Sequence, residues 1–144
     1  MEDKKVKQVI VFRHDLLKNL RKGKIAAQVA HASLGALLKC ANRTEHTNGF
    51  LYTDKWTRIE FDFNKDSILD KWLNGIFTKI CLYVENEEEL LEIYNKAQAI
   101  GLPCALITDA GNTEFHGIPT NTCVGIGPSW SDDIDKITGN LKLF

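Results

Sequence analysis

The chain has 144 residues, of which 44% are hydrophobic and 26% charged, and its formal net charge is −1. These proportions are typical of a globular protein, and the length suits a single domain over residues 1–144 with its own core. Because no stretch approaches the roughly 20 apolar residues of a membrane helix and the start has no apolar signal core, we expect no membrane partner and a cytoplasmic location.

The first third of the chain predicts a strand followed by a helix. The apolar, β-branched run at residues 6–13 is typical of a buried strand. A polar connection over 15–23 follows, and then a helix over 24–41 in which apolar residues recur at helical spacing. The stripe that this spacing predicts for the core consists of Ile25, Val29, Ala32 and Ala36.

The segment 43–75 is predicted to be an insert in the fold. Residues 42–48 are polar and predict a loop. Residues 58–63 alternate between polar and apolar, as a strand with one exposed face does, and could form a hairpin with 50–53. Residues 67–74 predict a short helix. The insert has enough apolar surface to pack as a flap on the core, although it could equally be a longer connection and nothing more.

The second half of the chain predicts three more strands and two helices. The helix at 86–100 has clear end signals, because Asn86 and Glu89 form a capping pair and Gly101 follows the helix. The other predicted elements are strands at 77–84, 104–108 and 122–126 and a helix at 132–137. This order predicts an α/β fold, a three-layer α/β/α sandwich around a mixed, mainly four-stranded sheet, with the insert at about 43–75.

Basic residues are concentrated at the start of the chain. Residues 1–24 hold eight Lys/Arg against three Asp/Glu, whereas the rest is acidic. Cations at 21–24 oppose the dipole of the helix that begins there, which favours a phosphate ligand at this point. A solvated run of surface charge is the alternative. Lys24, Gln28 and His31 share one helical face and indicate the wall of a polar pocket.

A second polar cluster follows the strand at 104–108. Asp109 comes directly after this strand and precedes small residues, so it could point into a cleft at the carboxyl end of the sheet. An ordinary turn is the alternative. The chain has no Walker loop, nucleophile elbow or zinc-binding spacing, and its four isolated cysteines are expected to be reduced core residues. We therefore expect no metal site.

Five motifs occur in order along the chain. They are QVIVFRHDL at 8–16, KGKIAAQVAHA at 22–32, DAGNTE at 109–114, VGIGP at 124–128 and DKITGNLKL at 135–143. Together they resemble the archaeal and eukaryotic-type (class II) peptidyl-tRNA hydrolases. The resemblance implies an α/β/α fold and no obligatory metal or organic cofactor. It also implies hydrolysis of the ester between a peptide and the 3′ end of tRNA, which recycles the tRNA.

The resemblance also implies the site residues. The catalytic lysine of the family matches Lys24, its aspartate Asp109, and its two threonines Thr113 and Thr122. Because an aminoacyl ester is already activated, the site mainly has to position a water and stabilise an oxyanion. Asp109 is expected to orient or deprotonate this water, directly or through Thr113. The residues expected to bind the substrate are Lys18, Arg21, Lys22, Gln28, His31 and Asn112.

Three departures from the family pattern leave other functions open. The connection 15–24 is one residue longer than usual, Asn112 stands where some members carry arginine, and 43–75 exceeds the compact family core. One alternative is a catalytically silent module that binds tRNA or a protein on the same fold. Another is a different small hydrolase or transferase. The expected partner is peptidyl-tRNA, and a homodimer is left open.

Overall fold

The computed structural model describes residues 3–48 and 54–144, and its centre is a mixed sheet of five strands. These strands are β1 (Val6–Arg13), β4 (Lys79–Val84), β5 (Cys104–Asp109), β6 (Thr120–Trp130) and the short β7 (Lys142–Leu143). Their order is β5-β6-β1-β4-β7, with β1 parallel to β4 and the other pairs antiparallel. The predicted mixed, mainly four-stranded sheet is confirmed, and β7 adds a short edge strand.

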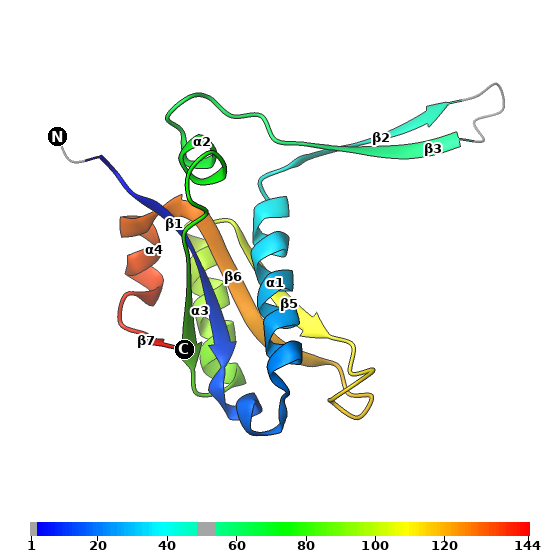
Figure 1. Ribbon diagram of the computed structural model, residues 1–144, viewed down its shortest axis with the longest axis vertical. Coiled ribbons are helices and arrows are strands. Elements are labelled where there is room, and N and C mark those ends of the chain that lie inside the picture. The colour runs from blue at the N-terminus through cyan, green and yellow to red at the C-terminus, as the bar shows by residue number, and fades with distance from the viewer. Residues whose placement is uncertain (1–2, 49–53) are drawn as a thin grey trace.

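Helices cover both faces of this sheet (Figure 1). One face carries α1 (Lys22–Leu38), and the opposite face carries α3 (Glu87–Ala99) and α4 (Ser131–Thr138). The predicted three-layer α/β/α sandwich is therefore confirmed. No helix among residues 3–48 and 54–144 is long and apolar enough to cross a membrane.

The residues of β1 alternate between two cores. Val9 and Val11 belong to the core under α3 and α4, whereas Ile10 and Phe12 belong to the core under α1. All four are at most 1% exposed. A strand that is buried on both faces needs an unbroken apolar run, which is why this segment could be recognised from the sequence.

Small residues allow α1 to pack closely on β6. A Cβ atom at Gly125 of β6 would collide with the backbone of Ala32 in α1. Ala32 and Ala36 are fully buried at this contact, as the core stripe predicted. This close packing also brings the start of α1 near the polar residues where β5 ends and β6 begins.

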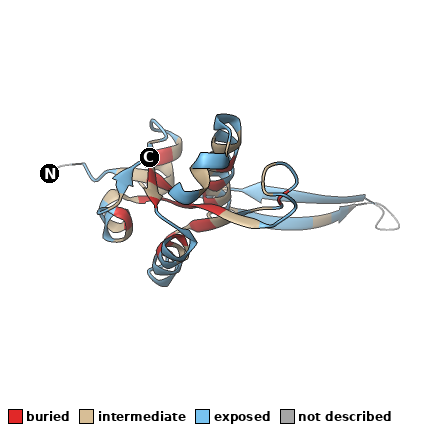
Figure 2. Ribbon diagram, turned by 90° about the horizontal axis from the view of Figure 1, so that it is seen from below, coloured by how far each residue is buried: buried red, intermediate tan, exposed pale blue. Residues whose placement is uncertain are grey.

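A hairpin projects from the body of the protein (Figures 1 and 2). Its strands, β2 (Asn42–Asn48) and β3 (Asp54–Glu60), pair antiparallel and form a separate two-stranded sheet. The loop predicted for 42–48 is therefore wrong. Residues 42–45 and all of β3 are exposed. Because β2 is held by backbone pairing with β3, it needs no alternation of apolar and polar residues such as a half-buried strand shows. The predicted partner strand at 50–53 lies outside the described residues.

The segment 43–75 covers the core only through its second half. There α2 (Ile68–Leu73) begins after Ser67, whose hydroxyl accepts a hydrogen bond from the N–H of Asp70. Trp72 of α2 is 3% exposed and packs on the body. The hairpin itself projects away from the core (Figures 1 and 2).

The predicted polar connection at 15–23 differs from the structure, whereas the predicted start of α3 agrees with it. The 3-10 helix η1 (His14–Asn19) occupies most of the predicted polar connection, and α1 begins at Lys22, earlier than expected. The helix α3 begins after Asn86 as predicted, and the Asn86 side chain accepts a hydrogen bond from the N–H of Glu89 at 3.0 Å. Its capping signals therefore fixed the start of α3 more sharply than the polar residues fixed the start of α1.

Candidate active site

Lys24 and Asp109 meet where α1 begins and β5 ends. The ammonium nitrogen of Lys24 lies 2.6 Å from Oδ2 of Asp109, and the two side chains are only 15% and 11% exposed. Lys24 is in the first turn of α1, and Asp109 is the last residue of β5. Because α1 packs against β5 and β6, this edge of the sheet brings the two predicted polar clusters together.

Further donors hold the Asp109 carboxylate in place. Its Oδ2 also accepts from Nε2 of Gln28 at 3.0 Å, and its Oδ1 accepts from the backbone N–H of Gly111 at 2.8 Å. The hydrogen bond from Lys24 lowers the pKa of Asp109 below its ordinary value, and the Gly111 and Gln28 donors act in the same direction against the effect of burial. Asp109 is therefore an ionised carboxylate at neutral pH.

Thr122 acts on this carboxylate through Gln28. The Thr122 hydroxyl, on β6, donates to Oε1 of Gln28 at 2.6 Å and is completely buried. This bond fixes which end of the amide faces Asp109, so that the NH₂ group donates to the carboxylate. Gln28 is itself only 2% exposed. Both residues lie behind Asp109, and the structure places Gln28 away from the surface on which a substrate would rest.

Thr113 lies on the open side of the ion pair. Its hydroxyl oxygen is 3.0 Å from the ammonium nitrogen of Lys24, and the residue is exposed. Since the hydroxyl accepts this bond from Lys24, its own hydrogen remains available to a ligand or a water. The four predicted catalytic residues therefore form one connected network, with Thr113 at its surface and Thr122 at its base.

A cavity of about 540 Å³ lies beside Thr113, between η1 and the loop 110–119. Glu114 fixes one wall, because its carboxylate accepts from the backbone N–H of Arg21 at 3.3 Å and lies 3.9 Å from the Arg21 guanidinium. The ring of Phe115 lies 5.8 Å from the Lys24 ammonium. Sequence reasoning did not single out Glu114 or Phe115 as site residues, although both lie within or next to the motif at 109–114.

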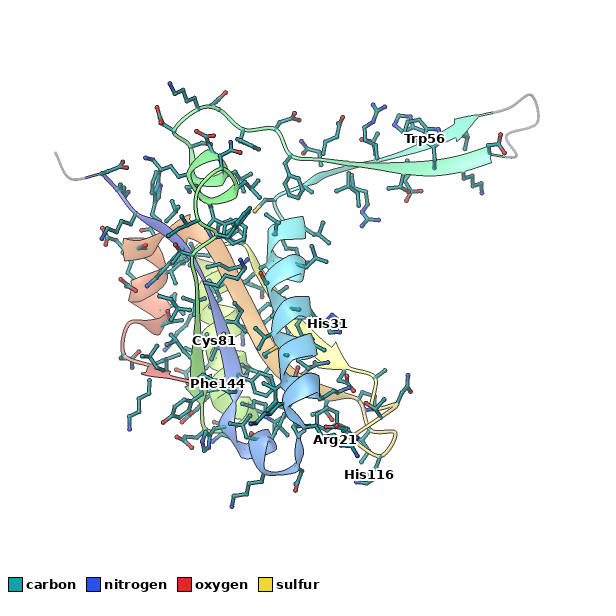
Figure 3. The ribbon with its side chains drawn as sticks, in the orientation of Figure 1. Arg21, His31, Trp56, Cys81, His116 and Phe144 are labelled. Carbon is teal, nitrogen blue, oxygen red and sulfur yellow. The ribbon has the colours of Figure 1, made fainter. Side chains whose placement is uncertain are left out.

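The remaining predicted substrate-binding residues are exposed. Lys18 and Lys22 flank the start of α1, which has no side-chain cap and no acidic residue in its first turn. Arg21 lies at the same end as the loop 110–119 (Figure 3). His31 lies about two turns beyond Lys24 along α1 and outside the hydrogen-bond network of Asp109. Lys24 and Gln28 therefore converge on Asp109, as their shared helical face suggested, whereas His31 does not.

Asn112 is exposed in the loop that joins Asp109 to Thr113. This position is compatible with the predicted role in substrate binding, because the loop borders the cavity beside Thr113.

The cysteines offer no nucleophile at this site. All four lie in the described part of the chain and are free. Burial raises the pKa of the Cys123 thiol to about 12, so this cysteine stays protonated and unreactive at neutral pH. No cluster of three or more His, Cys, Asp or Glu side chains that could hold a metal ion occurs within residues 3–48 and 54–144.

Comparisons with known proteins show which family the chain resembles over nearly its whole length. The family model described as peptidyl-tRNA hydrolase PTH2 matches residues 6–144. A peptidyl-tRNA hydrolase from Metallosphaera sedula is 41% identical over 138 residues, covering 96% of this chain and 99% of that protein. One from Methanopyrus kandleri is 40% identical, covering 95% and 97% of the two chains. The solved structure of a protein of unknown function from Agrobacterium tumefaciens covers 100% of this chain and 99% of its own, with a TM-score of 0.52. At 11% identity it supports the fold alone.

Proposed function

Because the chain belongs to the peptidyl-tRNA hydrolase PTH2 family, we propose that it cleaves the ester between a peptide and the 3′ end of tRNA and so releases the tRNA for reuse. The observation that carries this proposal is the ion pair of Lys24 and Asp109, with the Thr113 hydroxyl beside it on the open side. An ester that is already activated needs no strong nucleophile, and such a site can supply what hydrolysis requires.

Lys24 is the proposed electrophilic group. An ammonium group has three N–H donors, of which one points to Asp109 and one to Thr113. The third remains for the carbonyl oxygen of the ester, where negative charge develops as water attacks. A preorganised donor at this point stabilises the transition state more than the bound ester, which is what raises the rate. Asp109 keeps the ammonium in place while the substrate enters.

Asp109 is proposed to position the water rather than to act as a strong base. A carboxylate with a lowered pKa is a weak base. Because the efficiency of general-base catalysis follows the basicity of the base, such a carboxylate removes a proton from water poorly. Thr113 can hold the water by donating its free hydroxyl hydrogen. The water oxygen then bonds to the carbonyl carbon, the bond to the ribose 3′ oxygen breaks, and the proton lost by the water ends on that oxygen. Thr122 and Gln28 serve as positioning residues for Asp109.

The start of α1 is proposed to bind a phosphate close to the 3′ end of the tRNA. Uncapped N–H groups and the positive end of the helix dipole attract an anion. Lys22 and Arg21 lie at this end, and Lys18 is in the preceding η1. The cations that are unfavourable for the free helix become favourable once a phosphate is bound.

Translation substrates make a cytoplasmic location the natural proposal for this enzyme. A homodimer is a further proposal from the sequence, and light scattering of the purified chain tests it. The rival function is a silent module that binds tRNA without cleaving it. Against this rival, the network joins five polar residues from α1, β5, β6 and the loop 110–119, which a pure binding surface would not require.

Turnover of purified peptidyl-tRNA by the purified chain tests the proposal directly. Release of free peptide and uncharged tRNA is the expected result, with a rate about 10²–10³-fold lower in Lys24→Ala. Binding of peptidyl-tRNA and of uncharged tRNA with equal affinity and no release of peptide would favour the silent module instead. Denaturation curves of both forms confirm that the variant is folded.

A further inference from the structure

The hairpin of β2 and β3 does not pack on the core of the protein and so adds no buried contacts to it. All seven residues of β3 are exposed, and the hairpin projects clear of the sandwich (Figures 1 and 2). An isolated two-stranded hairpin is marginally stable in water. An arm of this kind, which neither covers the core nor touches the active site, is most simply explained by a partner that it contacts.

The two faces of the hairpin differ in composition. The register pairs His46 with Trp56 and Arg43 with Ile59, and successive residues of a strand point to opposite faces. His46 and Trp56 therefore share one face with Arg58, which we name the Trp56 face. The opposite face of the hairpin, which we name the Arg43 face, consists of Arg43, Glu45, Thr47, Lys55, Thr57 and Ile59.

The Trp56 face holds the hairpin together. The rings of His46 and Trp56 stack with their centroids 4.0 Å apart, and the guanidinium carbon of Arg58 lies 5.1 Å from the centroid of the Trp56 ring. Cross-strand pairs of this kind are the main source of stability in a two-stranded sheet. The aromatic and cationic side chains of this face are thus occupied with one another, and the cations of the Arg43 face are left for a partner.

The Arg43 face is turned to the same side of the molecule as the active site. Figure 3 shows Trp56 on the side of the hairpin that points away from α1. Alternation along the strand then directs Lys55 to the opposite side. On that side Figure 3 also shows His31, halfway along α1, and Arg21 at its start. The α1 helix separates the hairpin from Lys24 by about 20 Å, at 1.5 Å per residue.

We propose that the Arg43 face binds the phosphate backbone of the tRNA at a distance from the 3′ end, an inference that rests on the proposed function. Arg43 and Lys55 are cations on this face and Glu45 is its one carboxylate, so the face carries a net positive charge. Thr47 and Thr57 add hydroxyl groups, which also bind phosphates. Ile59 is the only large apolar residue among its described members, too little for a hydrophobic protein partner.

The path of the RNA supports this assignment. A tRNA whose 3′ ester lies beside Lys24 must continue away from the site as a polyanion. Exposed basic side chains occur along this route, among them Arg21 at the start of α1, His31 in the middle, and Arg43 on the hairpin. Arg21 is 91% exposed at its side chain and so can meet a phosphate without loss of packing. The hairpin would thus recognise the body of the tRNA and leave the chemistry to Lys24.

The test compares two substrates of different RNA length. One is full-length peptidyl-tRNA, and the other is the same peptide esterified to a short oligonucleotide that corresponds to the tRNA 3′ end. The variants are Arg43→Ala, Lys55→Ala and the two combined. Arg58→Gln is the matched control, because it removes one charge from the opposite face of the same hairpin and keeps a planar polar group over the Trp56 ring. These side chains are exposed, so the variants should fold, which thermal melting checks.

We expect the double variant to raise KM for full-length peptidyl-tRNA about three- to tenfold with kcat unchanged. The slope of log affinity against log salt should become shallower by about 1.5, the loss expected for two phosphate contacts. The KM for the short substrate with every variant, and the KM for full-length peptidyl-tRNA with Arg58→Gln, should equal those of the unmodified chain. An unchanged KM for full-length peptidyl-tRNA, or an equal loss with both substrates, overturns the proposal.

Dimerisation through the hairpin and failure of the proposed function would each give a different result. If the hairpin joined two copies of the chain, light scattering would show a lower mass for the double variant, with KM independent of RNA length, and the proposal would be wrong. If the proposed function itself failed, the unmodified chain would cleave neither substrate. Cleavage of both substrates with no effect of the hairpin variants would refute the hairpin proposal alone.

Discussion

The ammonium of Lys24 and the carboxylate of Asp109 form a 2.6 Å ion pair between residues 85 positions apart in the chain. Both side chains are largely covered, so each charge depends on the other. We expect Lys24→Ala and Asp109→Ala each to lower kcat by about 10²–10³-fold, the usual cost of losing a preorganised transition-state contact. Single-turnover hydrolysis of peptidyl-tRNA measures this loss.

The conservative variants separate charge from position in this ion pair. Lys24→Arg keeps the charge but cannot place a single ammonium between Asp109 and Thr113, so it should recover little of the lost rate. Asp109→Asn keeps the shape and removes the charge that holds Lys24. Near-normal turnover in either alanine variant would mean that the proposed catalytic site is wrong. Melting curves show whether a loss of turnover reflects unfolding.

Thr122 offers a test of a residue that acts without touching substrate. In Thr122→Val the buried Oε1 of Gln28 loses its donor, which should lower the free energy of unfolding by about 1–3 kcal/mol. The amide of Gln28 can then turn away from Asp109, and we expect kcat to fall roughly tenfold with KM unchanged. Thr122→Ser retains the hydroxyl and should restore kcat. A fall in stability alone, with normal kcat, would reduce Thr122 to a structural role.

The lowered pKa of Asp109 predicts how the site responds to acid. The largest cause is the hydrogen bond from Lys24, and the ordinary value is 3.8. The stability that this carboxylate contributes is therefore present above pH 3.8 and is lost as pH falls through the lower pKa of the folded state. Titration of the carboxyl carbon by NMR should show a midpoint below 3.8. In Lys24→Met the midpoint should rise, and an unchanged midpoint would contradict the assigned cause.

Much of this site could be predicted because its parts follow regular patterns. The family resemblance found from five motifs is confirmed by the match over residues 6–144. Helical spacing placed Lys24 and Gln28 on one face of α1, and the end of a buried strand placed Asp109 at the ligand edge of the sheet. Helical spacing alone could not reveal that the Gln28 side chain is buried, because its burial depends on a hydrogen bond from the Thr122 hydroxyl of β6.

The loop and the hairpin were harder to predict, for physical reasons. The positions of Glu114 and Phe115 depend on the backbone of Gly111 and Gly117, which both have positive φ. Such angles leave no periodic signal in the sequence. The strand at 42–48 carries polar residues on both faces, so no alternation of apolar residues marks it as a strand.

Chelators are expected to leave turnover unchanged. The proposed reaction uses the ammonium of Lys24 where a metal-dependent hydrolase would use a Lewis-acidic ion. Activity should therefore survive dialysis against EDTA in a buffer in which monovalent salt keeps the tRNA folded. Loss of activity with EDTA, restored by a divalent ion on a short RNA substrate that needs no folding, would require a metal in the mechanism.

Gly111 connects the geometry of the loop to the charge of Asp109. Its backbone N–H donates to Asp109 at 2.8 Å, and its φ is +83°. A Cβ at this position would lie 2.6 Å from backbone atoms of Ile118, so Gly111→Ala must displace the loop. Gly117 has a similar φ of +77° with no heavy atom within 4 Å of an added Cβ, which makes Gly117→Ala a control for backbone strain alone.

We expect Gly111→Ala to lower kcat at least tenfold, because the displaced N–H no longer holds Asp109 and Thr113 moves with the loop. Gly117→Ala carries the same backbone strain, about 1–2 kcal/mol, without the collision, and should retain most of the activity. Gly111→Ala should therefore lose more stability than Gly117→Ala as well as more kcat. Equal kcat values in the two variants would show that the loop tolerates the collision, and that the Gly111 hydrogen bond contributes little to the alignment of the site.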